Sequence, residues 1–274
     1  MIERVDWNLV KDHGLNKFIN FNRPVVIHSV DTSLGLMKWS LDKIVNTYGS
    51  IEIRVLKSTS QYFVYSDKKE RKIVKMRLEE FYDKSILNPG CDGYYYTLGR
   101  SPIAQFNNFE DYMILPNSLS KVVDGAFRNP ERNIWISPKG TRTALHFDAV
   151  DNLNLQIEGC KDFLLFPPRI KGMGTYHWTS QAAYVSSIDP REPDLPADFP
   201  RDDGMNVKLV KGEMLYLPYG WWHQVNSVGS SNLNANYWWF PRIKLFTHPE
   251  QTIRGAAVLI NRMGQHPHKR AEKL

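Results

Sequence analysis

Cysteine is scarce in this chain and long apolar runs are missing, and both absences limit what it can be. Its 274 residues include two cysteines, Cys91 and Cys160. These are too few for a disulfide scaffold or a zinc ribbon, so we expect two reduced thiols. No stretch reaches the roughly 18 apolar residues of a transmembrane helix. The N-terminal segment MIERVDWNLVKDHG is charged where a signal peptide is apolar. The sequence therefore predicts a cytoplasmic protein.

A strong excess of one charge is absent as well. The chain has 35 basic and 29 acidic side chains and a net charge of +6, which permits an acidic or nucleic-acid partner without requiring one. The densest basic run is SDKKERKIVKMR, residues 66–77, with six basic side chains. Two interpretations stay open for this run: a solvated face or hairpin, and a phosphate-binding patch.

Internal repeats and low-complexity segments are lacking, and strand patterns dominate what is present. The first third predicts helices over 7–21 (broken at Gly14), 39–48 (between Ser40 and Gly49) and 77–86, and strands over 23–30 and 51–58. Short strands and turns then follow one another from about residue 93 to 240, and a helical pattern returns over 249–263. A series of short strands favours a barrel or a sandwich.

Turn signals within the strand series predict two β-hairpins, each made of two strands that follow one another in the chain. The turn PKGT separates RNIWIS from TALHFD, and Gly159 separates NLNLQIEG from KDFLLFPP. Strands joined by short turns commonly form hairpins, so we expect one hairpin at each place. Residues 169–204 form a long connection punctuated by prolines. Such a loop inside a compact domain is typical of a functional segment or a lid.

A candidate metal site begins with His146 and Asp148. They lie two residues apart on a predicted strand, so their side chains point to one face and can offer one nitrogen and one oxygen to the same ion. His223, which follows a strand and a turn at Pro218 and Gly220, is the best candidate for a third ligand. Two histidines and a carboxylate leave three positions of an octahedral ion open, as in non-haem Fe(II) oxygenases. The competing interpretation is a set of unrelated polar side chains.

Amides alternate with apolar residues on two predicted strands. Asn152, Asn154 and Gln156 share one face of their strand, and NLNANYWWF, residues 232–240, repeats the pattern. An ordinary barrel interior is apolar, so an amide-lined face indicates a cavity that holds a polar ligand or an ion.

Together these motifs resemble a known family. The patterns T-x-x-H-F-D-x-x-x-N-x-x-x-Q-I-x-G-x-K-x-x-x-L-F-P-P, G-E-x-L-Y-L-P-x-x-W-W-H and N-x-N-x-W are similar to those of the JmjC, or cupin-like, 2-oxoglutarate oxygenases. The resemblance implies a mainly β fold with flanking helices around a double-stranded β-helix (jelly-roll, cupin-like) core. It also implies one domain over 1–274: a mixed α/β part (1–92), the core (93–240) with a lid (169–204), and a C-terminal helix with a basic tail (241–274).

The resemblance further implies Fe(II) as the metal, with 2-oxoglutarate and O2 as cosubstrates. The iron ligands would be His146, Asp148 and His223. The side chains that correspond to 2-oxoglutarate contacts are Thr143, Lys161, Asn152, Asn236 and one of Tyr94 and Tyr96. Because 2-oxoglutarate is a dianion in a narrow cavity, a lysine beside its distal carboxylate is also what physical chemistry requires.

Thr143 raises a problem of periodicity. It lies three positions before His146, so a regular strand would place the two side chains on opposite faces. A β-bulge near Ala144 would bring both side chains into the same cavity.

The implied activity is hydroxylation of an unactivated C–H bond. A peptide or protein side chain is the preferred substrate, followed by a modified tRNA base and then by an amino acid or natural-product intermediate. A cupin isomerase and a non-catalytic cupin-like binding module are alternatives from other classes, and the isomerase would need no dicarboxylate pocket. The C-terminal helix carries a stripe of Ile253, Ala256, Ala257 and Ile260, which predicts either a homodimer contact or packing on the core.

Overall fold

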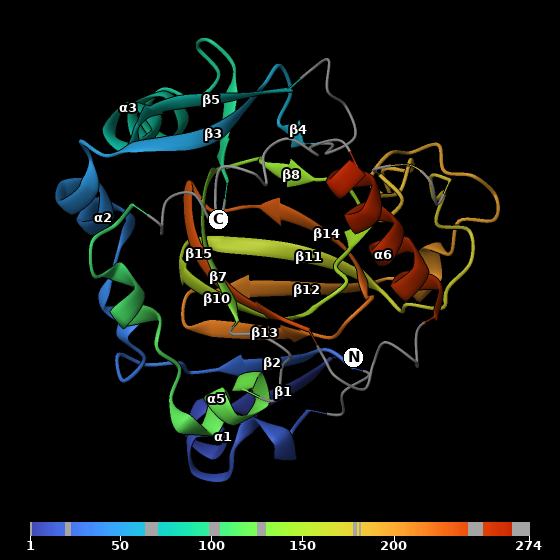
Figure 1. The fold of residues 1–274 in the computed structure, drawn as a ribbon, viewed down its shortest axis with the longest axis horizontal. Helices are drawn as coiled ribbons and strands as arrows, with labels where there is room; N and C mark the ends of the chain where they lie inside the picture. The colour runs from blue at the N-terminus through green and yellow to red at the C-terminus, as the bar shows by residue number, and fades with distance from the viewer. Residues whose placement is uncertain are drawn as a thin grey trace.

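The computed structural model describes residues 2–19, 23–63, 71–98, 105–124, 130–177, 180, 182–240 and 249–264. Two six-stranded sheets face each other and form the core (Figure 1). The first has the order β1 (Glu3–Asp6), β2 (Val25–His28), β13 (Glu213–Leu217), β10 (Asp151–Glu158), β15 (Ser231–Trp239) and β7 (Glu131–Pro138). The second has the order β12 (Met205–Val210), β11 (Cys160–Phe166), β14 (Trp222–Ser227), β8 (Arg142–Thr143) and β4 (Tyr62–Phe63), with β9 (His146–Phe147) also paired to β14. This arrangement confirms the predicted mainly β, jelly-roll core.

A smaller sheet and several short helices surround the two core sheets. The sheet has the order β5 (Arg71–Arg77), β3 (Glu52–Ser58) and β6 (Tyr94–Thr97). The α-helices are α1 (Trp7–His13), α2 (Leu41–Tyr48), α3 (Leu78–Tyr82), α5 (Asn117–Asp124) and α6 (Pro249–Gly264). Shorter 3₁₀ segments are Leu15–Lys17, Gly35–Lys38, Phe109–Met113 and Arg201–Asp203, and a π-helical turn, Asp83–Leu87, follows α3. None of the helices in the described ranges is long and apolar enough to cross a membrane.

The strands on either side of both predicted turns lie in opposite sheets, which shows that both predicted hairpins are wrong. β7 pairs with β15, whereas β8 pairs with β14 and β4; β10 pairs with β13 and β15, whereas β11 pairs with β12 and β14. Gly159 forms the corner between β10 and β11 with φ +79°, and a Cβ there would lie 2.1 Å from Ser231 O. Each tight turn of this fold carries the chain across to the facing sheet, so a turn signal does not imply pairing of its two flanks.

Helix α2 forms where the sequence predicts it, for local reasons. The Ser40 hydroxyl accepts a hydrogen bond from Lys43 N at 3.2 Å and caps the first turn, and Gly49 follows the last residue. Its buried residues Leu41, Ile44 and Tyr48 recur at helical spacing. The helix therefore presents one apolar face to the core.

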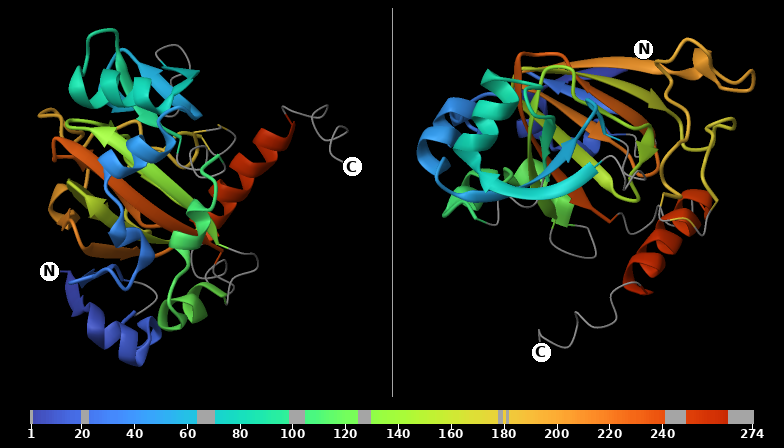
Figure 2. Two further views of the ribbon diagram at one scale, coloured as in Figure 1. Left: turned by 90° about the vertical axis from the view of Figure 1, so that its left-hand side faces the viewer. Right: turned by 90° about the horizontal axis from the view of Figure 1, so that it is seen from above.

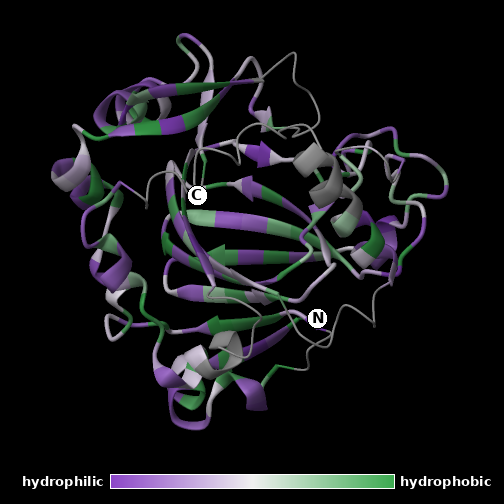
Figure 3. Ribbon diagram, in the orientation of Figure 1, coloured by the Kyte–Doolittle hydropathy of each residue, from purple (hydrophilic) through white to green (hydrophobic). Residues whose placement is uncertain are grey.

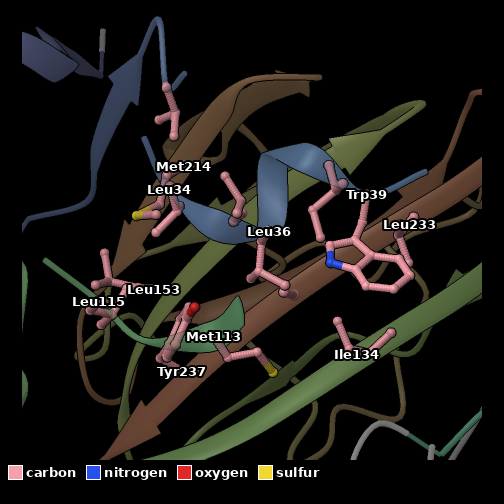
Figure 4. Close-up of a cluster of buried hydrophobic side chains, with 14 of the residues drawn as sticks. Leu34, Leu36, Trp39, Met113, Leu115, Ile134, Leu153, Met214, Leu233 and Tyr237 are labelled. Atoms are coloured by element: carbon pink, nitrogen blue, oxygen red, sulfur yellow. The ribbon is translucent and has the colours of Figure 1, made fainter. Parts of the chain in front are cut away.

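The main hydrophobic cluster lies outside the amide-lined interior. Leu153 of β10 and Leu233 and Tyr237 of β15 pack against Leu36 and Trp39 of the N-terminal part (Figure 4). Along β12, hydrophobic and hydrophilic bands alternate (Figure 3). The same alternation holds for β10 and β15. Because successive side chains of a strand point to opposite faces, the apolar residues of these two strands face the cluster and their amides face the interior.

The long connection between β11 and β12 is partly fastened to the core. Val185 forms a β-bridge with His146, Ser186 N donates to Leu145 O at 2.8 Å, and Phe147 N donates to Tyr184 O at 3.0 Å. The stretch 184–186 thus extends the second sheet beyond β9. The lid function predicted for 169–204 stays a prediction, and residues 178, 179 and 181 of that range lie outside the described residues.

Helix α6 leaves the core at one side, and its C-terminal end points away from the sheets (Figure 2). Its first turns are anchored to the core and to the long connection. The Tyr219 hydroxyl lies 3.0 Å from Thr252 Oγ1, Gln251 Nε2 donates to Pro168 O, and Arg254 Nη1 donates to Tyr176 O at 2.9 Å. The basic tail, 265–274, lies outside the described residues.

Candidate metal centre and cosubstrate pocket

Three potential metal ligands converge at one end of the second sheet. His146 on β9 lies directly across from His223 on β14, and the centroids of their rings are 4.2 Å apart. Asp148 follows β9, with its Oδ2 3.7 Å from His223 Nε2. One ligand atom from each residue lies within 4.8 Å of the other two. The three side chains can therefore share a single ion.

Backbone carbonyls orient both imidazole rings. His146 Nδ1 lies 2.7 Å from Ala144 O, and His223 Nδ1 lies 3.0 Å from Trp221 O. A carbonyl only accepts, so Nδ1 holds the proton in each ring and Nε2 is left as a metal ligand. Burial, together with the neighbouring His146, lowers the pKa of His223 to about 4. His223 is therefore neutral at pH 7, as a ligand must be.

The strand that carries Thr143 is interrupted, as its spacing from His146 predicts. Arg142 pairs with Asn226, and His146 pairs with His223, so three residues of one strand (143–145) oppose two of the other (224–225) between these pairs. β8 and β9 are separate two-residue strands on either side of this irregularity. Thr143 and His146 consequently line the same cavity.

The cavity beside the three ligands has a volume of about 400 Å³. It brings together all the predicted site residues except Tyr94, and its walls include Tyr96, Trp135, Thr143, His146, Asp148, Asn152, Asn154, Lys161, Tyr184, His223, Asn234, Asn236, Trp238 and Phe240. Tyr96 stacks on Trp135 with ring centroids 5.3 Å apart. Tyr94 lies on the same strand face but lines a different hollow, with Thr59. The geometry thus favours Tyr96 over Tyr94 as the tyrosine contact.

Lys161 lies deep in this cavity without a carboxylate beside it. Its side chain is buried, with 3% of its surface exposed, and burial lowers its pKa to about 7. Across the described ranges, no acidic side chain forms an ion pair with it. A buried ammonium group that lacks a counter-ion is a binding group for an anion.

The neighbouring polar groups also have unused hydrogen-bonding capacity. Thr143 Oγ1 accepts from Val225 N at 3.0 Å, which leaves its hydroxyl proton for a ligand. Asn236 Oδ1 accepts from Trp135 Nε1 at 3.2 Å, which leaves its amide N–H groups. Asn152 Oδ1 is buried without a hydrogen-bond partner. Together with Lys161, this set fits a small molecule with carboxylates at both ends, and the two histidines and Asp148 fit Fe(II).

An amide ladder closes the inner end of the cavity. Asn234 Nδ2 donates to Asn154 Oδ1 at 2.5 Å and to Gln156 Oε1 at 3.1 Å. Farther in, Gln156 Nε2 lies 3.4 Å from Asn232 Oδ1, which also accepts from Cys160 N. The inner amides hydrogen-bond to one another, although Asn234 Oδ1 is buried without a partner, and Asn152 and Asn236 nearer the metal ligands keep groups for a ligand. The alternating amides of the two strands therefore include some that can contact a ligand and others that hydrogen-bond mainly to one another.

Sequence reasoning did not identify several aromatic walls of the cavity. Trp135, Tyr184 and Phe240 line it but belong to no metal or amide pattern. Trp238 lies with them. Tyr184 could not be assigned because its position depends on the pairing of 184–186 with β9.

A double-stranded β-helix with two histidines and a carboxylate beside a buried lysine defines the class of JmjC-type oxygenases. Residues 12–244 match the family model described as "Cupin-like domain". The chain therefore belongs to the JmjC, cupin-like family of iron- and 2-oxoglutarate-dependent oxygenases.

Curated relatives carry names of two kinds. The chain is 37% identical over 107 residues to JmjC domain-containing protein D of Dictyostelium discoideum, covering 38% of this chain and 24% of the relative. It is 34% identical over 110 residues to Lysine-specific demethylase JMJ30 of Arabidopsis thaliana, covering 39% and 25%. It is 23% identical over 228 residues to tRNA wybutosine-synthesizing protein 5 of Mus musculus, covering 79% and 71%. The chain thus spans about a quarter of the first two relatives.

Proposed function

We propose that the protein is an Fe(II)- and 2-oxoglutarate-dependent dioxygenase that hydroxylates an unactivated C–H bond, with a peptide or protein side chain as substrate. The observation that carries the proposal is the convergence of His146, Asp148 and His223 beside the buried, unpaired Lys161. Bound Fe(II) would supply oxygen activation coupled to conversion of 2-oxoglutarate to succinate and CO2.

The protein's own groups would bind and orient the cosubstrate. Lys161 is assigned to the distal carboxylate, and Thr143 to a carboxylate through its free hydroxyl proton. Asn152 and Asn236 are assigned to the remaining polar atoms. The aromatic walls around Trp135 exclude water, which strengthens each of these charged contacts.

A succinate-release assay tests the proposal and its substrate class together. The protein is supplied with Fe(II), 2-oxoglutarate and O2, and cell lysate is divided into protein, RNA and small-molecule fractions. Succinate release above the background stimulated by the protein fraction supports the proposed substrate. Release with the small-molecule fraction alone would instead indicate an amino acid or natural-product intermediate.

A modified tRNA base is the second candidate substrate, for two specific reasons. The relative with the greatest two-way coverage among the three described is named for tRNA wybutosine synthesis. In addition, the basic run of residues 66–77 continues along β5, where Lys72, Lys75 and Arg77 are exposed. Glu52 and Glu79 pair with Lys75 and Arg77 and reduce the net charge of this face, so protein remains the first choice. Residues 66–70 lie outside the described residues.

A spectroscopic measurement separates the oxygenase from the two rival classes. Anaerobic addition of Fe(II) and 2-oxoglutarate should give a weak visible charge-transfer band, because the cosubstrate would bind the iron directly. A folded protein without this band would be a cupin isomerase or a non-catalytic binding module. The His146→Ala variant is the matched control and should lose the band while retaining the fold.

We also propose a homodimer through α6. Ile253 is 59% exposed and Ala256 is exposed as well, whereas Gln251 and Gly255 face the core. The side chains of Ala257 and Ile260, the rest of the predicted stripe, lie outside the described residues. Sedimentation should show a dimer for the wild type and a monomer for Ile253→Asp. A monomeric wild type would contradict this assembly.

A further inference from the structure

Behind the cavity, one buried carboxylate joins three parts of the fold. Asp189 belongs to the long connection after β11, and its side chain is only 8% exposed. Gln224 Nε2 of β14 donates to Asp189 Oδ1 at 2.9 Å, and Arg142 Nη2 of β8 makes an ion-pair contact of 2.9 Å with Oδ2. Arg191 N also donates to Oδ1, at 3.1 Å. Asp189 therefore links two strands and the connection.

The two strand residues held by Asp189 are chain neighbours of site residues. Arg142 precedes Thr143, and Gln224 follows His223. Successive side chains of a strand point to opposite faces, so the outer face carries Arg142 and Gln224 where the inner face carries Thr143 and His223. Asp189 thus contacts the outer-face neighbours of Thr143 and His223, whose own side chains line the cavity.

β8 is a short strand that pairs with β4 on one side, Tyr62 opposite Arg142 and Phe63 opposite Thr143, and with β14 on the other. It has two residues and a single register pair with β14, Arg142 opposite Asn226, and the chain is irregular between Thr143 and His146. The guanidinium of Arg142 also lies over the ring of Tyr62, 4.7 Å from its centroid. The planar guanidinium and the buried carboxylate restrict the orientation of this short strand in addition to its backbone pairing.

The same part of the connection also contributes to the wall of the cavity. Ile188 N donates to Ser186 Oγ at 2.9 Å, Ser186 N donates to Leu145 O, and Tyr184, two residues earlier, lines the cavity. We call residues 184–192 the clamp segment. One end of this segment is fixed to β9, and the other is fixed by Asp189 to β8 and β14.

We propose that Asp189 is a positioning residue of the cosubstrate site. Through Arg142 and Gln224, it holds Thr143 and His223 at the spacing that 2-oxoglutarate and the metal require, and it fixes Tyr184 in the cavity wall. The proposal rests on the function proposed above. A residue outside the cavity would thus maintain the geometry of a site that contains an irregular strand.

Calorimetric binding of 2-oxoglutarate to the Mn(II)-loaded protein tests this role. Asp189→Asn keeps the size of the side chain and removes its charge, and we expect about tenfold weaker binding of 2-oxoglutarate. Glu158→Gln is the matched control, since Glu158 also ties distant parts of the core by accepting from Leu41 N and the Ser231 hydroxyl. The control should lower thermal stability and leave 2-oxoglutarate binding unchanged. Equal weakening in both variants would show a merely structural role and overturn the proposal, as would an Asp189→Asn variant that binds 2-oxoglutarate like the wild type.

Two further measurements keep the test decisive. If Asp189→Asn fails to fold, Arg142→Gln removes the same ion pair from a side chain that is 25% exposed, and the same tenfold weakening is expected. Amide hydrogen exchange of the metal-free protein needs no cosubstrate. The amides of Phe147 and Ser186 should exchange faster in Asp189→Asn, and unchanged protection would overturn the proposal. A wild-type protein that binds no 2-oxoglutarate would contradict the proposed function instead. The hydrogen-exchange result would still test the role of the clamp segment in that case.

Discussion

At the scale of single residues, Lys161 connects stability to ligand binding. Its buried ammonium group lacks a carboxylate partner within the described ranges, and burial lowers its pKa to about 7. We expect Lys161→Met to bind 2-oxoglutarate about 100-fold more weakly, since the dianion loses its charged partner. The same change should raise the free energy of unfolding of the metal-free protein by about 1–2 kcal/mol, because an apolar side chain replaces an uncompensated buried cation. Calorimetry and urea unfolding measure the two effects, and a variant that binds 2-oxoglutarate normally would contradict the assignment.

The lowered pKa of Lys161 also predicts opposite effects of pH on binding and stability. Above pH 7 the folded protein loses the Lys161 proton, while the unfolded chain keeps it up to the ordinary value of 10.5. The unfolded state then holds more protons, so this group makes the ligand-free protein more stable as pH rises from about 7 to 10.5. Binding of the dianion requires the charged form, so its affinity should fall about tenfold between pH 7.5 and 8.5. Lys161→Met should show neither dependence.

Residue patterns predicted most of the site, and the exceptions have physical causes. The alternation of amides placed Asn152 and Asn236 on one inner face, and the odd spacing of Thr143 and His146 correctly required an irregular strand. Tyr94 and Tyr96 could not be separated because both point to the same face of β6. The difference between them depends on how far along the strand the cavity extends, and a sequence pattern with a period of two does not contain that information.

At the scale of elements, local signals predicted the elements better than their partners. The Ser40 cap and Gly49 fixed the ends of α2 through contacts within a few residues. The predicted hairpins at PKGT and Gly159 were wrong because these turns join the two facing sheets. Strand pairing in this fold is set by contacts between distant segments, such as β10 with β15, and no turn signal encodes them.

Helix α6 offers a test at this scale, because a glycine lets it approach the metal ligands. Gly255 is buried and lines the cavity, and a Cβ there would lie 2.7 Å from Ala149 Cβ, next to Asp148. Alanine ordinarily stabilises a helix by about 1 kcal/mol relative to glycine. Here we expect Gly255→Ala to lower the free energy of unfolding by about 1–3 kcal/mol, since the helix or the loop must shift. Urea unfolding measures the change, with Asn46→Ala at an exposed position of α2 as control, and a more stable Gly255→Ala protein would contradict the close contact.

At the scale of the whole molecule, the two sheets should be stabilised together by a ligand held between them. The proposed metal ligands come from the second sheet, and Asn152 and Asn236 come from the first. At 100 times the dissociation constant, a ligand specific for the folded state adds about 2.7 kcal/mol of stability. Mn(II) with 2-oxoglutarate should therefore raise the melting temperature by about 5 °C. Chelation by EDTA should reverse the shift, and a shift that survives EDTA would indicate binding elsewhere.

The amide ladder has a consequence for the order of events in a catalytic cycle. Gln156 and Asn232 are fully buried behind the pocket, while the exposed Phe240 lines its open side. A diacid seated against Lys161 then sits behind any larger molecule that arrives later. Loading would be sequential, with the small acid first and the bulky substrate second. Succinate would remain in the pocket until the hydroxylated product dissociates. Product release would therefore limit the turnover rate for a tightly bound substrate.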